Sequence, residues 1–140
     1  RYIVSNDREF ISHKFIQSAF DSPDMYWTRP MSLEDIETMV NNSCTLGVFF
    51  RGPSSGSIVS STQVGMARML TDYVTFAYLT DVYIDPEHRG RGLAKWLMQC
   101  CEQMMDQMPE LRRCVLLTKG AERFYEKEMG MEVIGTDKNG

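Results

Sequence analysis

Residues 87–98 read "EHRGRGLAKWLM" and lie between an apolar stretch typical of a strand and an apolar stretch typical of a helix. The stretch before them, 75–85, has the continuous apolar character of a central strand, and Pro86 ends its ladder of hydrogen bonds. Gly90 and Gly92 then stand two apart among basic residues, which is more than an ordinary turn needs. The first N–H groups of a helix are free and its dipole is positive there, so the pattern predicts an anion-binding turn between a strand and a helix.

Two well-known phosphate motifs do not match this turn. A P-loop needs G-x-x-x-x-G-K-[ST], which residues 90–97, "GRGLAKWL", do not provide, and a dinucleotide fingerprint needs a third glycine and a βαβ unit near the start. The chain as a whole has a formal net charge of −4, whereas a nucleic-acid-binding domain is normally basic. We therefore expect a local anion site and no nucleic-acid partner.

Hydrophobic spacing along the rest of the chain predicts alternating strands and helices. Their expected order is β-α-α-β-β-β-α-β-α-β, an α/β arrangement. A polar connection over residues 51–61 is expected to be mobile. Strands are predicted at 2–5, 44–50, 62–70, 75–85, 113–118 and 131–135, and helices from an N-cap at Asp7 to 20, from an N-cap at Ser32 to 42, from 90 to 108, and from 120 to 129 with Gly130 after it.

Length and composition bound the class of protein. With 140 residues the chain is expected to form a single domain, residues 1–140. No apolar run reaches the length of about 18 to 20 residues that spans a bilayer, and residues 1–10 lack a secretory core, so no membrane partner is expected. The four cysteines contain no C-x-x-C pair and are expected to be reduced, which favours the cytoplasm or the nucleus. Neither His13 nor His88 has neighbours that complete a metal site, so no metal is expected.

The turn and its helix resemble the acetyl-CoA signature of the GNAT superfamily of N-acetyltransferases, [RQ]-x-x-G-x-[GA], which Arg89, Gly92 and Ala94 match. The order of the elements also fits, so the resemblance covers nearly the whole chain. It implies the GNAT fold, a central, mostly antiparallel mixed sheet flanked by helices, and acetyl-CoA as cosubstrate. A second family element is matched by Ala121, Phe124, Tyr125, Glu126, Lys127 and Gly130.

The sequence departs from the family pattern at two places. The family often has an asparagine seven positions before the tyrosine, where this chain has Thr118. Ten residues follow Gly130, which leaves room for one strand and hardly for the family's usual last hairpin. The acceptor site is then expected to be completed differently, for instance by another subunit of a homodimer.

The resemblance also implies which residues hold the cosubstrate. Backbone N–H groups from Arg89 to Lys95 would bind the pyrophosphate, and the side chains of Arg89, Arg91 and Lys95 would supply positive charge. Main-chain groups at Val82 and Ile84 would hold the thioester carbonyl and the pantetheine arm. The residues expected to bind acetyl-CoA are Val82, Tyr83, Ile84, Arg89, Gly90, Arg91, Gly92, Leu93, Ala94, Lys95 and Tyr125.

Two residues are candidates for proton transfer. In the family a tyrosine at the position of Tyr125 protonates the departing sulfur, and a phenol with a pKa of about 10 keeps its proton at neutral pH. Asp81 is the only carboxylate inside the strand 76–84 and is the candidate base that takes a proton from the amine. The alternatives are that Asp81 caps a bulge or pairs with a substrate ammonium, and that Tyr78 and Tyr83 carry a water relay.

The acceptor is predicted to be a primary amine, first of all that of a small molecule. Aromatic faces together with Asp72 or Asp81 would suit a cationic amine. No cysteine lies in a motif position for an acyl-enzyme, which favours direct attack in a ternary complex. The rival functions are acetylation of a protein lysine or N-terminus, and a catalytically silent acyl-CoA-binding module. Residues expected to border the amine are Tyr26, Trp27, Arg29, Asp72 and Tyr78.

Overall fold

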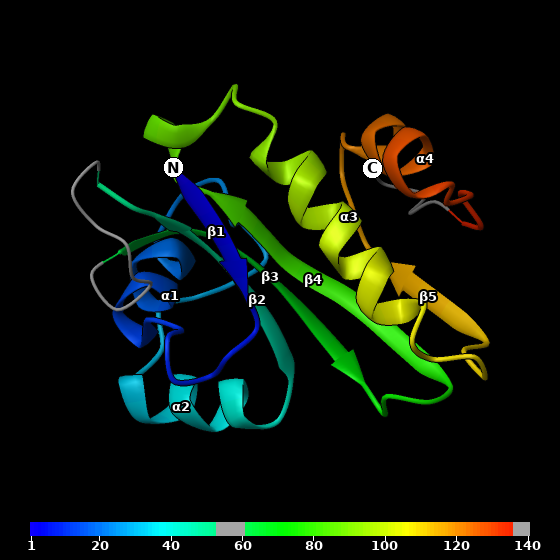
Figure 1. The fold of residues 1–140 in the computed structure, drawn as a ribbon, viewed down its shortest axis with the longest axis horizontal. Helices are drawn as coiled ribbons and strands as arrows, with labels where there is room; N and C mark the ends of the chain where they lie inside the picture. Colours follow the sequence, from blue (N-terminus) through cyan, green and yellow to red (C-terminus); the bar gives the residue numbers. More distant parts are fainter. Residues whose placement is uncertain (53–60, 136–140) are drawn as a thin grey trace.

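A single five-stranded mixed sheet forms the centre of the protein (Figure 1). The computed structural model describes residues 1–52 and 61–135, so most of the connection expected over 51–61 lies outside the described residues. The strands follow one another across the sheet in chain order; the first four pair antiparallel, and the last pair is parallel. The strands are β1 (Tyr2–Ser5), β2 (Cys44–Phe50), β3 (Thr62–Thr71), β4 (Phe76–Ile84) and β5 (Arg113–Leu116).

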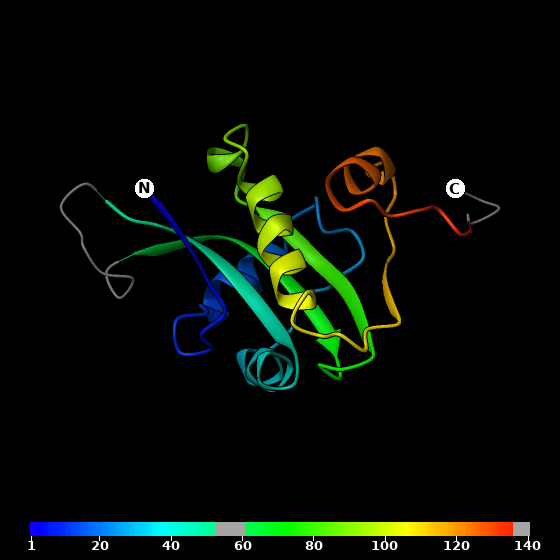
Figure 2. The same ribbon diagram turned by 45° about the vertical axis from the view of Figure 1, so that its right-hand side comes forward.

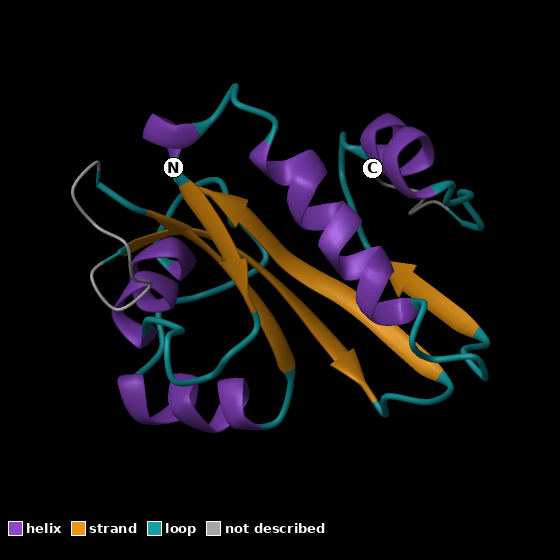
Figure 3. Cartoon of the chain, in the orientation of Figure 1, coloured by secondary structure: helices purple, strands orange, loops and turns teal. Residues whose placement is uncertain are grey.

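Helices cover both faces of this sheet, as Figures 2 and 3 show. One long helix, α3, crosses one face, and α1 and α2 pack on the other. The mixed α/β architecture predicted from sequence is thereby confirmed. None of the helices within the described ranges is long and apolar enough to cross a membrane. The helices are α1 (His13–Phe20), α2 (Leu33–Asn41), α3 (Leu93–Met105) and α4 (Glu122–Met129), with a short 3₁₀ helix, η2 (Pro86–His88), before α3.

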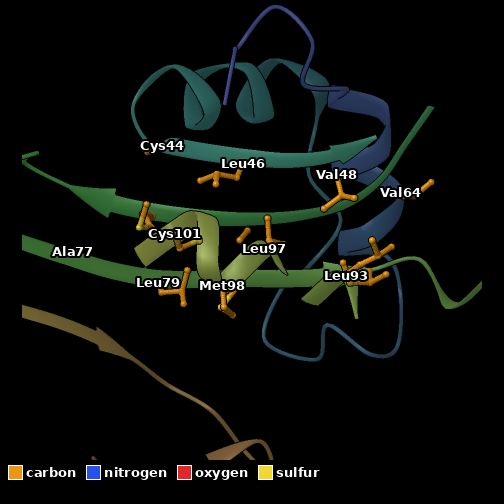
Figure 4. Packing of buried hydrophobic residues seen from close by; sticks show 13 residues of the cluster. Cys44, Leu46, Val48, Val64, Ala77, Leu79, Leu93, Leu97, Met98 and Cys101 are labelled. Atoms are coloured by element: carbon orange, nitrogen blue, oxygen red, sulfur yellow. The ribbon is translucent and has the colours of Figure 1, made fainter. Parts of the chain in front are cut away.

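The alternation of side chains along the strands divides the hydrophobic core into two layers. Leu79 of β4 points toward α3 and packs with Leu97 and Met98, which are fully buried (Figure 4). On the opposite face, α1 and α2 contribute Ile16 and Ile36, and neither residue has any exposed surface. The sheet is thus held between α3 and the α1–α2 pair.

The ends of the helices follow their capping residues, with one correction to the sequence prediction. Ser12, and not Asp7, caps α1, because the Ser12 hydroxyl accepts a hydrogen bond of 3.1 Å from the backbone N–H of Phe15. Asp7 closes a separate turn by accepting from the backbone N–H of Glu9. Ser32 caps α2 as predicted.

The C-terminal part of the sheet is smaller than predicted. Residues 131–135 form no strand and pair with none of the five strands within the described ranges. Ile134 accordingly keeps 90% of its side-chain surface exposed. The helix predicted over 90–108 is also shorter, because Gly90 and Gly92 have positive φ values that no α-helix allows.

An irregularity in β4 creates the geometry of the site. Met66 pairs with Tyr83 and Arg68 with Thr80, so Asp81 and Val82 together oppose a single residue of β3. Asp81 adopts a left-handed φ of 54°, which is uncommon for a residue with a side chain. The β4–β5 ladder reaches only Leu79, so the strand continues past the bulge without a β5 partner.

Candidate active site

The glycine turn predicted between a strand and a helix is present between η2 and α3. Gly90 and Gly92 have φ values of 78° and 76°, and Gly92 is the N-cap residue of α3 without any side-chain cap. A Cβ at either glycine would meet nothing within 4 Å, so the requirement for glycine is conformational and not steric. The N–H groups of the first α3 turn are therefore left for a ligand.

A cavity of about 380 Å³ opens at this turn. It runs from the start of α3 to the part of β4 beyond the bulge, and Phe124 of α4 closes one side. Residues that the sequence did not indicate also contribute: Asp24 and Met25 from the α1–α2 loop, and His88. The predicted cosubstrate residues that line the cavity are Val82, Tyr83, Ile84, Arg89, Gly90, Gly92, Leu93, Ala94 and Lys95; Arg91 and Tyr125 are not among the lining residues.

Arg89 is held by three neighbours. Its Nε donates to the carbonyl oxygen of Ile84 at 2.8 Å, and its Nη2 forms a 2.9 Å ion pair with Asp24. Its guanidinium carbon lies 5.5 Å from the centre of the Tyr83 ring. Asp24 thus compensates the charge of Arg89, so within the described chain Lys95 and the start of α3 remain as the uncompensated positive groups of the cavity.

His88 has a structural partner at the edge of this cavity. Its Nδ1 lies 2.8 Å from the hydroxyl of Tyr2, and its ring packs edge-on against that tyrosine. In residues 1–52 and 61–135 no three His, Cys, Asp or Glu side chains come together in a way that could hold a metal ion. His88 therefore links β1 to the turn.

Asp81 is buried at the β4 bulge and surrounded by donors. Its Oδ2 accepts from Nε and Nη2 of Arg68 at 2.9 and 2.8 Å. Its Oδ1 accepts from the Trp27 indole N–H at 2.8 Å and from the Thr80 hydroxyl at 3.4 Å. A carboxylate offers about four lone-pair positions, so these donors leave no position free for a substrate proton.

Arg68 was not predicted from sequence, although a signal for it exists. It is the only charged residue in β3, whose other residues are mostly buried. A charge in such a strand needs a partner, because an unpaired buried charge is strongly unfavourable. The sequence of β3 therefore implies a nearby carboxylate, which is Asp81.

A second cavity, of about 330 Å³, lies on the α1–α2 side of β4. Three of the predicted acceptor residues, Trp27, Arg29 and Tyr78, line it together with Arg68 and Asp81. Tyr26 does not line it; this side chain is 63% exposed and stacks edge-on against Trp27 with the ring centres 5.0 Å apart. The α1–α2 loop and β4 thus form the walls of this cavity.

Asp72, the remaining predicted acceptor residue, shapes the β3–β4 turn instead. Its carboxylate accepts hydrogen bonds from the Thr75 hydroxyl and from the backbone N–H groups of Val74, Thr75 and Phe76. These bonds, that of the Thr75 hydroxyl first, lower the pKa of Asp72 below its usual range. The turn lies beside the C-terminal end of α3, where the Thr71 hydroxyl contacts Met108. The 13 residues of α3, about 20 Å in length, separate it from the anion-binding turn.

Tyr125 packs on α3 beside the first cavity. Its ring contacts Phe124 edge-on with the centres 5.1 Å apart, and both rings lie against the α3-side core. Burial raises the pKa of the Tyr125 hydroxyl, and the neighbouring Cys101 thiol raises it further. The phenol therefore keeps its proton at neutral pH, while its contact with a cosubstrate stays a prediction.

The four cysteines are buried or half-buried free thiols. Burial raises the pKa of Cys101 to about 12, and the thiols of Cys44, Cys100 and Cys114 add to this shift. No cysteine is among the residues that line the two cavities. They are protonated core residues at neutral pH, because the reactive form of a cysteine is the thiolate.

Comparisons with known proteins agree with this geometry. Residues 14–131 match the acetyltransferase (GNAT) family. A protein of Gibberella zeae named a "putative acetyltransferase" is 33% identical over 140 residues, covering 94% of this chain and 79% of that protein.

Solved structures show the same architecture. One from Xanthomonas campestris pv. campestris, described as a "putative acetyltransferase belonging to the gnat family", has a TM-score of 0.80 and 31% identity, covering 96% of this chain and 87% of the other. The glucosamine-6-phosphate N-acetyltransferase of Arabidopsis thaliana has a TM-score of 0.67 with 98% and 95% covered, and at 13% identity this likeness concerns the fold alone. The extent of the family match and of the Gibberella zeae relative decides the classification: this chain belongs to the GNAT family of acetyltransferases.

Proposed function

We propose that the protein transfers the acetyl group of acetyl-CoA to the primary amine of a small molecule. The observation that carries this proposal is the position of the two cavities on either side of the β4 bulge. Val82 lines the first cavity and Asp81, its neighbour in the chain, lines the second. Two ligands bound in these cavities would meet at the bulge, which suits direct attack in a ternary complex.

Acetyl-CoA would supply a thioester, whose carbon–sulfur bond breaks as the amine nitrogen bonds to the acetyl carbon, while the amine loses one proton and the sulfur gains one. The free N–H groups of the first α3 turn and the Lys95 ammonium would bind its diphosphate. Past Leu79, main-chain groups of β4 have no β5 partner, and those at Val82 would bind the acyl end.

The two proton transfers are assigned to residues at the bulge and on α4. An alkyl amine has a pKa of about 10 and arrives protonated at neutral pH, so it must lose a proton before it attacks. Asp81 would take this proton after the Trp27 indole leaves Oδ1, a movement that is open to Trp27 because 47% of its side chain is exposed. Tyr125, whose raised pKa keeps it neutral, would donate a proton to the departing sulfur.

The acceptor distinguishes this function from its rivals. The cavity of about 330 Å³ lies at the lower end of the range for small-molecule sites, and the α1–α2 loop forms one wall of it, which favours a small amine over a peptide.

Thiol release from acetyl-CoA should be measured with a panel of small primary amines, lysine peptides and free N-terminal peptides. We expect turnover with small amines; faster turnover with peptides would identify a protein acetyltransferase, and CoA binding without turnover on any acceptor would identify a silent binding module.

Gly92→Ala should weaken CoA binding by about tenfold, because an L-residue disfavours a φ of 76° and relaxation of the turn moves its N–H groups. The measurement is CoA affinity by calorimetry, with urea unfolding to record stability. Gly120→Ala is the matched control: Gly120 has a φ of 88° and the same open surroundings, but it lines neither cavity. Equal loss of CoA affinity in both variants would contradict the role of the turn.

Tyr125→Phe should lower kcat by about 100-fold, the typical contribution of a general acid, and leave CoA affinity within about twofold. Single-turnover thiol release and CoA titration measure the two quantities. Tyr26→Phe removes a hydroxyl from an exposed ring outside both cavities and should change neither. Unchanged turnover in Tyr125→Phe would remove this phenol from the mechanism.

Trp27→Phe should retain or increase kcat, because it removes the indole N–H that competes with the amine for Asp81. Asp81→Asn should lower kcat by about 100-fold or more, because the amide cannot take the proton from the amine. Because Asp81→Asn also breaks the ion pair with Arg68, circular dichroism must first show that the variant is folded at the assay temperature. Wild-type kcat in folded Asp81→Asn would mean that another group, such as a Tyr78 relay, takes the proton.

A further inference from the structure

We propose that the acceptor amine carries an acidic group, a carboxylate or a phosphate, and that Arg29 binds this group. The inference rests on the proposed function, because it names the chemical class of the molecule that occupies the second cavity. It replaces the cationic amine suggested by the sequence, since the structure removes one of the two carboxylates on which that expectation depends.

The charges that line the second cavity sum to an excess of positive charge. Arg68, Asp81 and Arg29 are its charged residues. Arg68 and Asp81 neutralise each other through a short ion pair, with 13% and 3% of their side chains exposed. Asp72, which would have added a negative charge, is bound to its own turn. Arg29 has no ion pair within the part of the chain that the structure describes, so its charge is the uncompensated one.

The backbone around Arg29 is fixed, which prepares the side chain for a ligand. The preceding Thr28 donates its hydroxyl proton toward the carbonyl oxygens of Phe20 and Met25, both at 3.0 Å. On the other side, Gln17 of α1 donates to the carbonyl oxygen of Met31 at 3.0 Å. The ring of Pro30 further restricts the backbone of Arg29. A guanidinium on such a fixed segment loses less entropy when it forms bonds to an anion.

The reacting end of the acceptor is set by the bulge, and Arg29 lines the same cavity as Asp81. Trp27 contacts Asp81 directly, and Arg29 follows two residues later, at most about 7 Å away along an extended chain. Asp81 and Arg29 both line this cavity of about 330 Å³, so a small molecule that fills the cavity would contact both residues. The planar guanidinium fork matches a carboxylate or a phosphate through two parallel hydrogen bonds, whereas a second ammonium group would be repelled.

The test compares amines that differ only in the distal group. The pairs are 2-aminoethyl phosphate with ethanolamine and β-alanine with propylamine, and 1,3-diaminopropane adds a dication. Thiol release should give kcat/KM at least about tenfold higher for one of the acid-bearing members than for its neutral partner. The phosphate and carboxylate pairs separate the two possible acids. Higher kcat/KM for the neutral members or for the dication would overturn the inference.

Arg29→Gln should lower kcat/KM for the preferred acid-bearing amine at least about tenfold, mainly through KM, and change it less than about twofold for the neutral partner. Arg29→Lys should recover part of the loss, since it keeps the charge without the fork. Arg8→Gln, an exposed arginine outside both cavities, is the matched control and should behave as wild type. An equal loss with acid-bearing and neutral amines would reduce Arg29 to a structural residue and overturn the inference.

A binding measurement separates this inference from the proposed function. The change in Tm with 2-aminoethyl phosphate and with β-alanine is recorded in the presence of CoA, for wild type and Arg29→Gln. A rise in Tm that requires Arg29 supports the inference even if no amine is acetylated. In that case only the proposed acetyl transfer is contradicted. If neutral amines are acetylated and Arg29→Gln has no effect, the proposed transferase activity is supported and the acidic acceptor is contradicted. If there is no turnover of any amine and no Arg29-dependent rise in Tm, both the proposed function and the acidic acceptor are contradicted.

Discussion

The buried ion pair between Arg68 and Asp81 is the interaction on which the site depends. It ties β3 to β4 where two residues of β4 oppose one of β3, and it holds Asp81 in a backbone conformation that a residue with a side chain seldom adopts. Removing one partner of such a pair costs about 3–5 kcal/mol, because the other charge is left buried. The pair therefore maintains the bulge, and the bulge places the two cavities on either side of one strand.

The glycine-rich turn depends on the same strand from its other end. Arg89 donates to the last carbonyl group of β4, at Ile84, so the turn is joined to the strand through a side chain as well as through η2. Positive φ values at Gly90 and Gly92 precede α3, and the first turn of α3 lines the same cavity as the part of β4 that lacks a β5 partner. The glycine turn and the part of β4 without a β5 partner thus belong to one continuous segment of the chain.

Most features that depend on residues close together in the sequence were predicted correctly, whereas several features that depend on distant residues were missed. The turn at 87–98, the cap at Ser32 and the end of α4 depend on neighbouring residues, and the structure confirms them. The strand predicted at 131–135 required a partner strand, which local alternation of side chains cannot supply. Asp72 belongs to a turn whose donors lie within four residues, and only the fold shows that this carboxylate lies outside the second cavity. The Arg68–Asp81 pair and the Asp24–Arg89 pair join distant positions, so only the fold shows them.

The α1–α2 loop touches both cavities, through Asp24 at Arg89 and through Trp27 at Asp81. A ligand that displaces either contact changes the free energy of the same short segment. A ligand in one cavity that displaced its contact would thereby alter affinity at the other cavity, and thermodynamic reciprocity would make the effect equal in both directions. The four residues from Asp24 to Trp27 would consequently form an energetic link between ligands in the two cavities on either side of β4.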